Sequence, residues 1–435
     1  MNKISVKNIF FATSVLVSLS FAWMVAPAFA DVSSTAVTSG STAHSQGTKA
    51  SEQYENEGRA GGPIYDYGKG IQIGPAHFIP SIGYDYAWLD NVFYDERGTK
   101  SDYVNRLNTD ITGELPLGGG QHLISMSYVT STEWFERFSS QDHTDQTVGA
   151  GIKLNYVPFS LNVEDHFQRT VDRSGTEFTA RIPRDENTSH GLLEIPFSQF
   201  FLETEVFDLN EDYRNPDQIT FTHNDLGIFQ RAGIDISGNN QFLVEYGYKN
   251  IDYSGTPERN ATANQFALGL RGNLTERVTY QIWGGAQYRI YDLDSLPDFN
   301  GFIMRGAFQY AISDTSHVAL KLDRTPQEST FDNQSFYVRN RAEIDWRQQI
   351  AERIFFNTRE SLDYNEYSRI TVFNSIKQQT RRDYTWQAGA GLEYQLPNNL
   401  TSLTLDYRFN GRVSNLDGSL GYDAQEITAG IRTSF

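Results

Sequence analysis

Most of this chain alternates apolar and polar residues in segments of ten to fifteen, and this pattern restricts its fold more than any other feature. In the segment 403–410, Leu405 and Tyr407 fall on one side of an extended strand, whereas Asp406 and Arg408 fall on the other. Period-two alternation indicates β-strands. Charged residues in the middle of a strand require that its second face meets water.

Two other fold classes are weighed against this pattern. No stretch after Ala30 comes near the roughly 18 consecutive apolar residues that a membrane-spanning helix needs. A water-soluble β-sandwich also alternates, but it rarely sustains ten or more segments with aromatics on one face and charges on the other. The pattern therefore favours an all-β transmembrane antiparallel up-and-down β-barrel, with the sandwich as the alternative.

The turn signals predict 18 strands, with 16 as the alternative. Tight connections rich in Gly, Pro, Asn and Asp follow every even strand, and longer polar ones follow most odd strands. An even count with both termini in the periplasm follows. The predicted strands are 77–94, 101–115, 121–135, 144–156, 159–171, 184–195, 198–211, 220–236, 241–254, 260–273, 277–292, 299–312, 317–330, 335–349, 353–367, 380–396, 400–414 and 421–435.

The first 30 residues indicate export. Lys3 and Lys7 precede an apolar stretch that closes on Ala28-Phe29-Ala30, the layout of a cleavable signal peptide. Residues 31–62 are rich in Ser, Thr, Gly and Ala and predict a disordered periplasmic tail. The barrel is expected over 63–435. The chain has no cysteine, which excludes a lipoprotein anchor, a disulfide framework and a thiolate metal site.

Composition agrees with an outer-membrane barrel of a Gram-negative bacterium. Without Lys3 and Lys7, the 36 basic residues fall to 34 against 54 acidic ones, a net charge of −20. This acidity argues against a nucleic-acid partner. The 24 Tyr and 29 Phe suit aromatic girdles at the two membrane interfaces. Lipid and lipopolysaccharide are the expected surroundings.

The first barrel strand carries a family resemblance. The run from Pro80 through Tyr84, Tyr86 and Trp88 to Asp90-Asn91-Val92-Phe93 resembles the opening of the putative β-barrel porin-2 family. Members of that family resemble components of exopolysaccharide secretion clusters, so the resemblance implies a role in polymer export. The Asp-Asn pair is also interpretable as an ordinary strand-to-loop turn.

The end of the chain resembles an assembly signal. Ile427, Ala429, Ile431 and Phe435 occupy alternate positions of the final strand. A terminal aromatic on such a strand resembles the signal read by the barrel-assembly machinery, which makes that machinery an expected partner.

The face opposite the apolar residues is expected to line the lumen. This places ten basic residues inside: Arg231, Arg271, Arg289, Arg305, Lys321, Arg339, Arg341, Arg359, Arg408 and Arg432. It also places ten acids there: Asp110, Glu114, Glu203, Glu205, Glu245, Asp323, Glu343, Asp345, Glu393 and Asp406. One interpretation is a mutually paired network. The other is an Arg-rich wall that conducts an anionic polymer, with aromatics such as Trp283 stacking on sugar rings.

No catalytic, cofactor or metal motif emerges. The eight His show no metal-ligand spacing, and no HExxH, GxSxG or Walker sequence occurs. Asp142-His143 resembles a barrel-protease pair but suits an exposed polar loop better. Asp292, Asp294 and Asp298 could bridge cations to lipopolysaccharide, although a solvated acidic loop is the simpler interpretation.

Three functions remain open. The first is a conduit or accessory component for exopolysaccharide export, working with periplasmic export components. The second is a general diffusion porin for small hydrophilic solutes. The third is a plugged scaffold barrel of a secretion system that binds partners through the 31–62 tail. An enzyme is the least supported class.

Overall fold

The protein was analysed as a computed structural model that describes residues 70–173, 177, 179–237, 239–330, 334–373, 377–416 and 420–435. The predicted signal peptide 1–30 and the predicted tail 31–62 lie outside the described residues. In the part of the chain that the structure describes, no helix is long and apolar enough to cross a membrane.

The secondary structure is almost entirely extended. The strands are β1 (Ile71–Ile73), β2 (Ala76–Leu89), β3 (Asp102–Leu117), β4 (His122–Phe135), β5 (His143–Tyr156), β6 (Phe159–Thr170), β7 (Arg184–Phe197), β8 (Phe200–Tyr213), β9 (His223–Ser237), β10 (Asn240–Tyr253), β11 (Ala261–Thr275), β12 (Val278–Tyr291), β13 (Phe299–Ser313), β14 (Ser316–Glu328), β15 (Phe336–Ala351), β16 (Ile354–Phe373), β17 (Lys377–Gln395), β18 (Thr401–Ser414) and β19 (Tyr422–Ser434). Four single-turn 3₁₀ helices interrupt the connections: η2 (Gly118–Gly120), η3 (Ser139–Gln141), η4 (Ile219–Phe221) and η5 (Pro257–Arg259).

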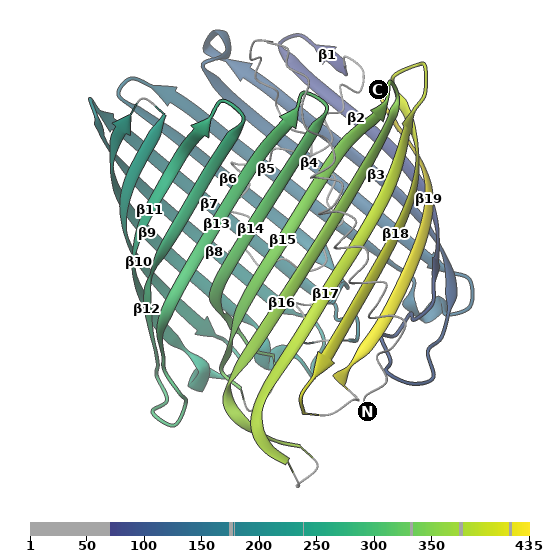
Figure 1. Cartoon of the computed structure of the whole chain (residues 1–435), viewed down its shortest axis with the longest axis vertical. Coiled ribbons are helices and arrows are strands. Elements are labelled where there is room, and N and C mark those ends of the chain that lie inside the picture. Colours follow the sequence, from purple (N-terminus) through teal and green to yellow (C-terminus); the bar gives the residue numbers. More distant parts are fainter. Residues whose placement is uncertain are drawn as a thin grey trace. The chain divides into compact units, whose positions relative to one another are not determined.

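Strands β2 to β19 form one closed antiparallel barrel (Figure 1). Each strand pairs with the next along the chain, and β19 returns to pair with β2, where Ser434 lies opposite Ser81. The backbone N–H of Phe435 donates to the carbonyl of Pro80 at 3.0 Å and extends this seam. The predicted barrel of 18 strands is therefore confirmed. β1 is a short addition that pairs only with the first residues of β2.

The two rims differ in the length of their connections. Turns of a few residues link β5 to β6, β7 to β8, β11 to β12 and β13 to β14 at one rim, whereas segments 90–101 and 171–183 are longer and lie at the other. Both β1 and the C-terminus lie at the rim of tight turns (Figure 1). In outer-membrane barrels the tight turns are periplasmic, so β1 and the C-terminus lie at the periplasmic rim of this barrel.

Three predicted boundaries were wrong. The three-residue β1 was missed, because so short a strand leaves no periodic signal. β2 ends at Leu89 rather than 94, and the next residue, Asp90, uses its side chain to accept a hydrogen bond from the backbone N–H of Gln425. Residues 368–379 were predicted as a loop, but β16 continues to Phe373 and β17 begins at Lys377.

Apolar side chains cover the outside of the barrel. The exposed fractions of Phe266, Leu268 and Leu270 on β11 are 56%, 56% and 41%, whereas the alternate residue Ala267 is 5% exposed. Exposed aromatics pair across strands on this face, as in the stacked rings of Tyr86 and Tyr103, whose centroids lie 5.5 Å apart. An apolar outer band with aromatics is the surface that a transmembrane barrel presents to lipid.

Candidate functional site: the lumen and its outer mouth

The basic residues predicted inside the barrel project from the inward face of their strands. On β12, Arg289 is 2% exposed and its neighbour Ile290 is 56% exposed, so the two point to opposite faces. Arg432 lies opposite Gly83 of β2 and Ser402 of β18. We predict that these side chains contact a passing solute.

Most of these cations are paired with lumenal acids. The pairs run along the wall from β8 to β19: Arg231 with Glu203, Glu205 and Glu245, Arg271 with Glu203, Arg289 with Glu328, Arg305 with Glu245, Lys321 with Glu343, Arg339 with Asp323, Arg341 with Glu343, Arg359 with Asp345, and Arg408 with Glu426. Paired charges attract a distant anion far less than free ones. The wall is a compensated network rather than a positive stripe.

The densest part of this network surrounds Glu245, whose exposed fraction is 0%. Its carboxylate lies 2.7 Å from Nε of Arg231 and 3.1 Å from Nη2 of Arg305. Arg231 also reaches Glu205 at 2.5 Å and Glu203 at 3.6 Å. Buried charges persist only when paired and hydrogen-bonded, and each member of this cluster depends on the others.

Trp283 belongs to the same cluster and is not free to stack on sugars. Its exposed fraction is 4%, and it packs against Phe201 and Leu243. The guanidinium carbons of Arg231 and Arg305 lie 5.3 Å and 5.9 Å from its ring centroid. The expected stacking role was wrong for this residue, because the side chains of Arg231 and Arg305 cover its ring.

The loop between β6 and β7, residues 171–183, reaches a distant part of the wall. The carboxylate of Glu177 accepts hydrogen bonds from Oγ of Ser329 at 2.7 Å and from N and Oγ1 of Thr330 at 2.6 Å and 2.8 Å. Its carbonyl accepts a bond from Nη1 of Arg412 at 2.9 Å. The loop after β14 lies seven strands farther round the barrel than β7, so the contact spans the outer mouth.

The same loop is anchored at its base. Arg181 donates to Glu133 of β4 at 3.1 Å, to Asp172 at 3.2 Å and contacts the ring of His143 at 2.9 Å. Charge-assisted bonds from one guanidinium to several elements fix geometry well. Arg181 therefore ties both arms of the loop to the wall at β4 and β5.

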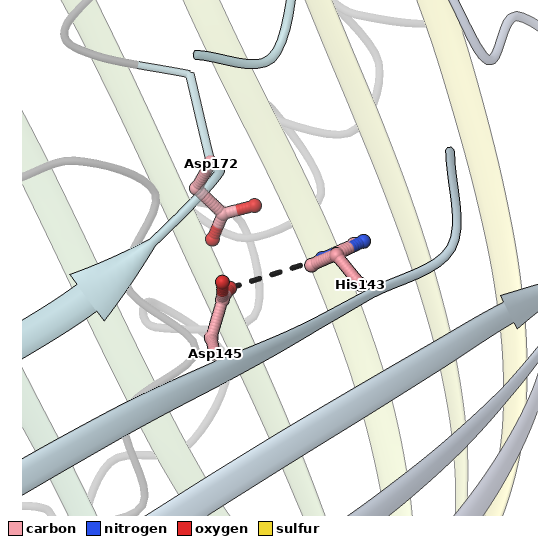
Figure 2. A group of neighbouring side chains, drawn as sticks. All are labelled: His143, Asp145 and Asp172. Atoms are coloured by element: carbon pink, nitrogen blue, oxygen red, sulfur yellow. Dashed lines mark ion pairs between the residues drawn. The ribbon is translucent and has the colours of Figure 1, made fainter. Parts of the chain in front are cut away.

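Three potential metal ligands converge at this anchor: His143 and Asp145 from β5, and Asp172 from the loop (Figure 2). His143 Nδ1 lies 2.8 Å from the carbonyl of Gln141, so Nδ1 carries the proton and Nε2 is the acceptor. Nε2 and Asp172 both already contact Arg181. The guanidinium of Arg181 thus supplies the positive charge that a metal ion would bring to these three side chains. The three residues and Arg181 together anchor the loop.

The first residues of the segment 90–101 pack beside the loop. Arg173 donates to the carbonyl of Val92 at 2.8 Å, and its guanidinium carbon lies 3.7 Å from the ring centroid of Tyr94. Tyr94 stacks on Tyr422 of β19 with centroids 4.5 Å apart. Burial lowers the pKa of Arg173, and the positive charge of Arg181 adds to this. Residues from both segments thus narrow the mouth.

Arg259 of η5 fastens the loop between β14 and β15. Its Nη2 donates to the carbonyls of Ser329, Gln334 and Ser335, and the contacts to the last two measure 3.1 Å and 3.4 Å. Beneath it lies an apolar cluster on the inner face: Ile251, Tyr253, Ala261, Tyr291, Phe299, Ile303, Phe336 and Val338. Arg259 therefore holds Ser329, one of the residues that contact Glu177.

The sequence also matches a known family. The model of the family described as putative beta-barrel porin 2 matches residues 210–435, which is more than half of the 435-residue chain. The chain belongs to this family. The match runs from the end of β8 to the C-terminus and includes all ten predicted basic residues. The resemblance at Pro80–Phe93 lies outside the matched range, and the family assignment it suggested is confirmed independently.

Solved structures similar to this porin-2 barrel share little sequence with it. Acinetobacter baumannii OccAB3 is 12% identical with a TM-score of 0.45, covering 83% of this chain and 100% of its own. Pseudomonas aeruginosa OpdK with vanillate is 9% identical with a TM-score of 0.43, covering 82% and 99%. Pseudomonas aeruginosa OpdQ is 11% identical with a TM-score of 0.44, covering 83% and 99%. No curated protein matches the sequence.

Other residues singled out by the sequence have structural roles in this porin-2 barrel. Asp90 Oδ1 accepts a bond from the backbone of Gln425 at 2.6 Å, and Asn91 bonds both backbone groups of Asp95, as the turn interpretation expects. Asp142 accepts a bond from the backbone of Phe135 at 2.8 Å. Asp298 accepts one from the backbone of Tyr291 at 3.0 Å, and such carboxylates stabilise turns.

Sequence reasoning missed the residues that fill the mouth of the porin-2 barrel. Glu177, Arg173, Arg181 and Arg259 lie in connections whose composition reads as solvated loop. A weak signal existed: the segment 171–183 holds two Arg and is among the longest connections. Long structured loops in compact proteins are commonly functional.

Proposed function

We propose that this barrel is an outer-membrane conduit, or an accessory component, for the export of an exopolysaccharide. The observation that carries the proposal is the inner wall of a porin-family barrel, which presents polar groups and charge pairs along strands β9 to β19. Such a wall wets a channel and does not trap a chain by net charge. The family resemblance to secretion-cluster components supports the same function.

The paired wall changes which polymer is expected. An Arg-rich surface would select polyanions. The arginines here instead form ion pairs with Glu and Asp side chains of other strands. A neutral or weakly charged polymer meets less resistance from such a wall than a strongly charged one. We therefore propose hydroxyl-rich sugar chains in place of acidic ones.

Deletion and complementation test the proposal. A strain without the gene should lose surface polysaccharide, and the wild-type gene should restore it, as measured by total sugar released from washed cells. A variant with a broken barrel seam, such as loss of β19, gives the matched negative control. Unchanged surface polysaccharide in the deletion strain would remove the export function.

A general diffusion porin is the second candidate, favoured by the closed barrel of a porin family. It predicts faster uptake of small neutral sugars by cells that express the protein, without an effect on surface polysaccharide. Liposome swelling with the purified protein separates the two functions. A diffusion porin should let free monosaccharides pass quickly, whereas an export conduit should pass them slowly.

A further inference from the structure

A cavity of about 400 Å³ lies in the inner wall at the rim of tight turns, the periplasmic end of the barrel. Strands β9 to β13 and the turn between β9 and β10 supply its lining: Asp235, Asn239, Asn240, Gln241, Arg271, Gly272, Thr279, Tyr280, Gln281, Ala307 and Gln309. Volumes of this size accommodate small organic ligands, including one or two sugar rings. An exported chain that enters from the periplasm meets this part of the wall first.

The strand register makes the lining continuous. Gln241 lies opposite both Asp235 of β9 and Arg271 of β11, and Arg271 lies opposite Gln281 of β12. Gln281 in turn lies opposite Ala307 of β13. Residues directly opposite each other share one face of the sheet. One inward row therefore crosses five neighbouring strands.

The charges in this row are already satisfied within the wall. Arg271 donates from Nε to Gln241 at 2.6 Å and from Nη2 to the buried Glu203. Gln241 donates from its amide nitrogen to Asp235 at 2.8 Å. This chain of hydrogen bonds fixes the orientation of the Gln241 amide and the Arg271 guanidinium. Its charged members are the carboxylates of Asp235 and Glu203 and the guanidinium of Arg271, so it has no excess positive charge to attract an anion.

Polar groups project into the cavity beside that chain. Gln281 and Thr279 are exposed on the inner face of β12, and Thr279 donates to Gln309 of β13 at 3.4 Å, a long bond that a ligand can replace. An amide offers both donors and acceptors, and a hydroxyl does as well. A ligand whose own hydroxyls both donate and accept complements this surface.

We infer that this cavity is a binding subsite for a neutral, hydroxyl-rich oligosaccharide, which it captures at the periplasmic end of the barrel. The inference rests on the proposed function, since it names the substrate class and the place where it first binds. Gln281, Thr279 and Gln309 contact the sugar. Arg271 and Gln241 hold the wall in position.

Binding to the purified, detergent-solubilised protein tests the subsite. The probes are three neutral hexasaccharides, maltohexaose, cellohexaose and mannohexaose, with hexagalacturonate as the anionic comparison, measured by isothermal titration calorimetry. At least one neutral probe should bind, and Gln281→Ala should weaken it about tenfold through loss of one or two hydrogen bonds. The matched control is Gln387→Ala, since Gln387 is a glutamine of β17 away from the cavity, opposite Ser361 and Asn410.

The outcomes separate the subsite from the export function. The subsite is wrong if no neutral probe binds, if Gln281→Ala binds like wild type, if Gln387→Ala loses binding equally, or if hexagalacturonate binds tighter through Gln281. If deletion abolishes surface polysaccharide in any of these cases, export stands without the subsite. If the purified protein binds sugar through Gln281 but the deletion strain keeps its surface polysaccharide, the subsite stands and the barrel has a function other than export.

Discussion

At the scale of single residues, the main feature of the inner wall is its buried ion pairs. Glu245 has an exposed fraction of 0%, and the exposed fractions of Glu203 and Glu205 are 2% and 5%. Three carboxylates at such burial repel one another unless cations lie between them. Arg231 contacts all three, so it is the residue on which this part of the wall depends most.

Replacing Arg231 by Met should destabilise the barrel by about 3 kcal/mol, because removal of one partner leaves buried charge uncompensated. Thermal unfolding followed by the heat-modifiable shift on electrophoresis measures the effect. Arg97→Met is the matched control, since the side chain of Arg97 is 88% exposed and its ion pair joins it to the neighbouring Glu96 at 3.6 Å. Equal stability of the two variants would show that the cluster is not a structural unit.

Glu177 has the largest expected effect on conduction among single residues. Its carboxylate accepts three hydrogen bonds from Ser329 and Thr330 across the mouth. Glu177→Ala removes them and should increase single-channel conductance in planar bilayers. Glu258→Gln, an exposed acid of η5, should leave conductance unchanged. A Glu177→Ala channel with wild-type conductance would mean that the loop does not limit the path.

At the scale of elements, the strands were predictable and the loop positions were not. Alternation in segments such as 403–410 places Leu405 outward and Asp406 inward without any tertiary information. Glu177 carries no such signal, because the direction of a loop depends on partners far away in the sequence. Its main contacts, Ser329 and Thr330, lie 152 and 153 residues further on.

The charge pairs were predictable only as a class. The sequence placed Glu245 and Arg305 on one face, but their contact depends on the stagger between strands that are not adjacent. Trp283 shows the same limit, since alternation put it inside the barrel and could not reveal that Arg231 covers it. The face on which a side chain lies can be predicted from the sequence of one strand. Its contacts can be predicted only when the register of several strands is known.

Close strand packing in β12 predicts a sensitive glycine. A Cβ at Gly285 would lie 2.0 Å from the carbonyl oxygen of Phe266 and 2.6 Å from Cα of Ala267, and backbone atoms cannot move aside cheaply. Gly285→Ala should therefore destabilise the barrel by about 1–3 kcal/mol. Gly389→Ala on β17 is the control, because its nearest contact would be an ordinary 3.5 Å. Thermal unfolding of both variants tests this prediction. Equal unfolding midpoints would contradict the close packing at β12.

The last strand carries the prediction about assembly. Phe435 is 52% exposed and its backbone closes the seam to Pro80, so its ring is free for recognition before closure. Deleting Phe435 should reduce the amount of heat-modifiable barrel in outer membranes, whereas Phe435→Tyr should assemble normally. Normal assembly without Phe435 would exclude the assembly-signal role.

For the whole molecule, a closed wall and a partly filled mouth must work together. The pairing of β19 with β2 leaves no free sheet edge in the barrel, so the backbone is satisfied in lipid. The loop 171–183 and the segment 90–101 narrow the outer end, while the cavity of about 400 Å³ lies at the other. In the proposed conduit, a polymer enters at the end with the cavity and leaves past the loop residue Glu177, which contacts Ser329 and Thr330.

Single-channel recording with sugar present tests the account most directly. Protein purified from outer membranes is reconstituted in a planar bilayer, and each of the three neutral hexasaccharides, or hexagalacturonate, is added to one side and then the other. We predict a steady ion current that at least one neutral hexasaccharide interrupts reversibly, more often from the side of the tight turns. A bilayer without current, or a current that no neutral hexasaccharide interrupts from either side, would contradict a conduit for neutral sugar chains.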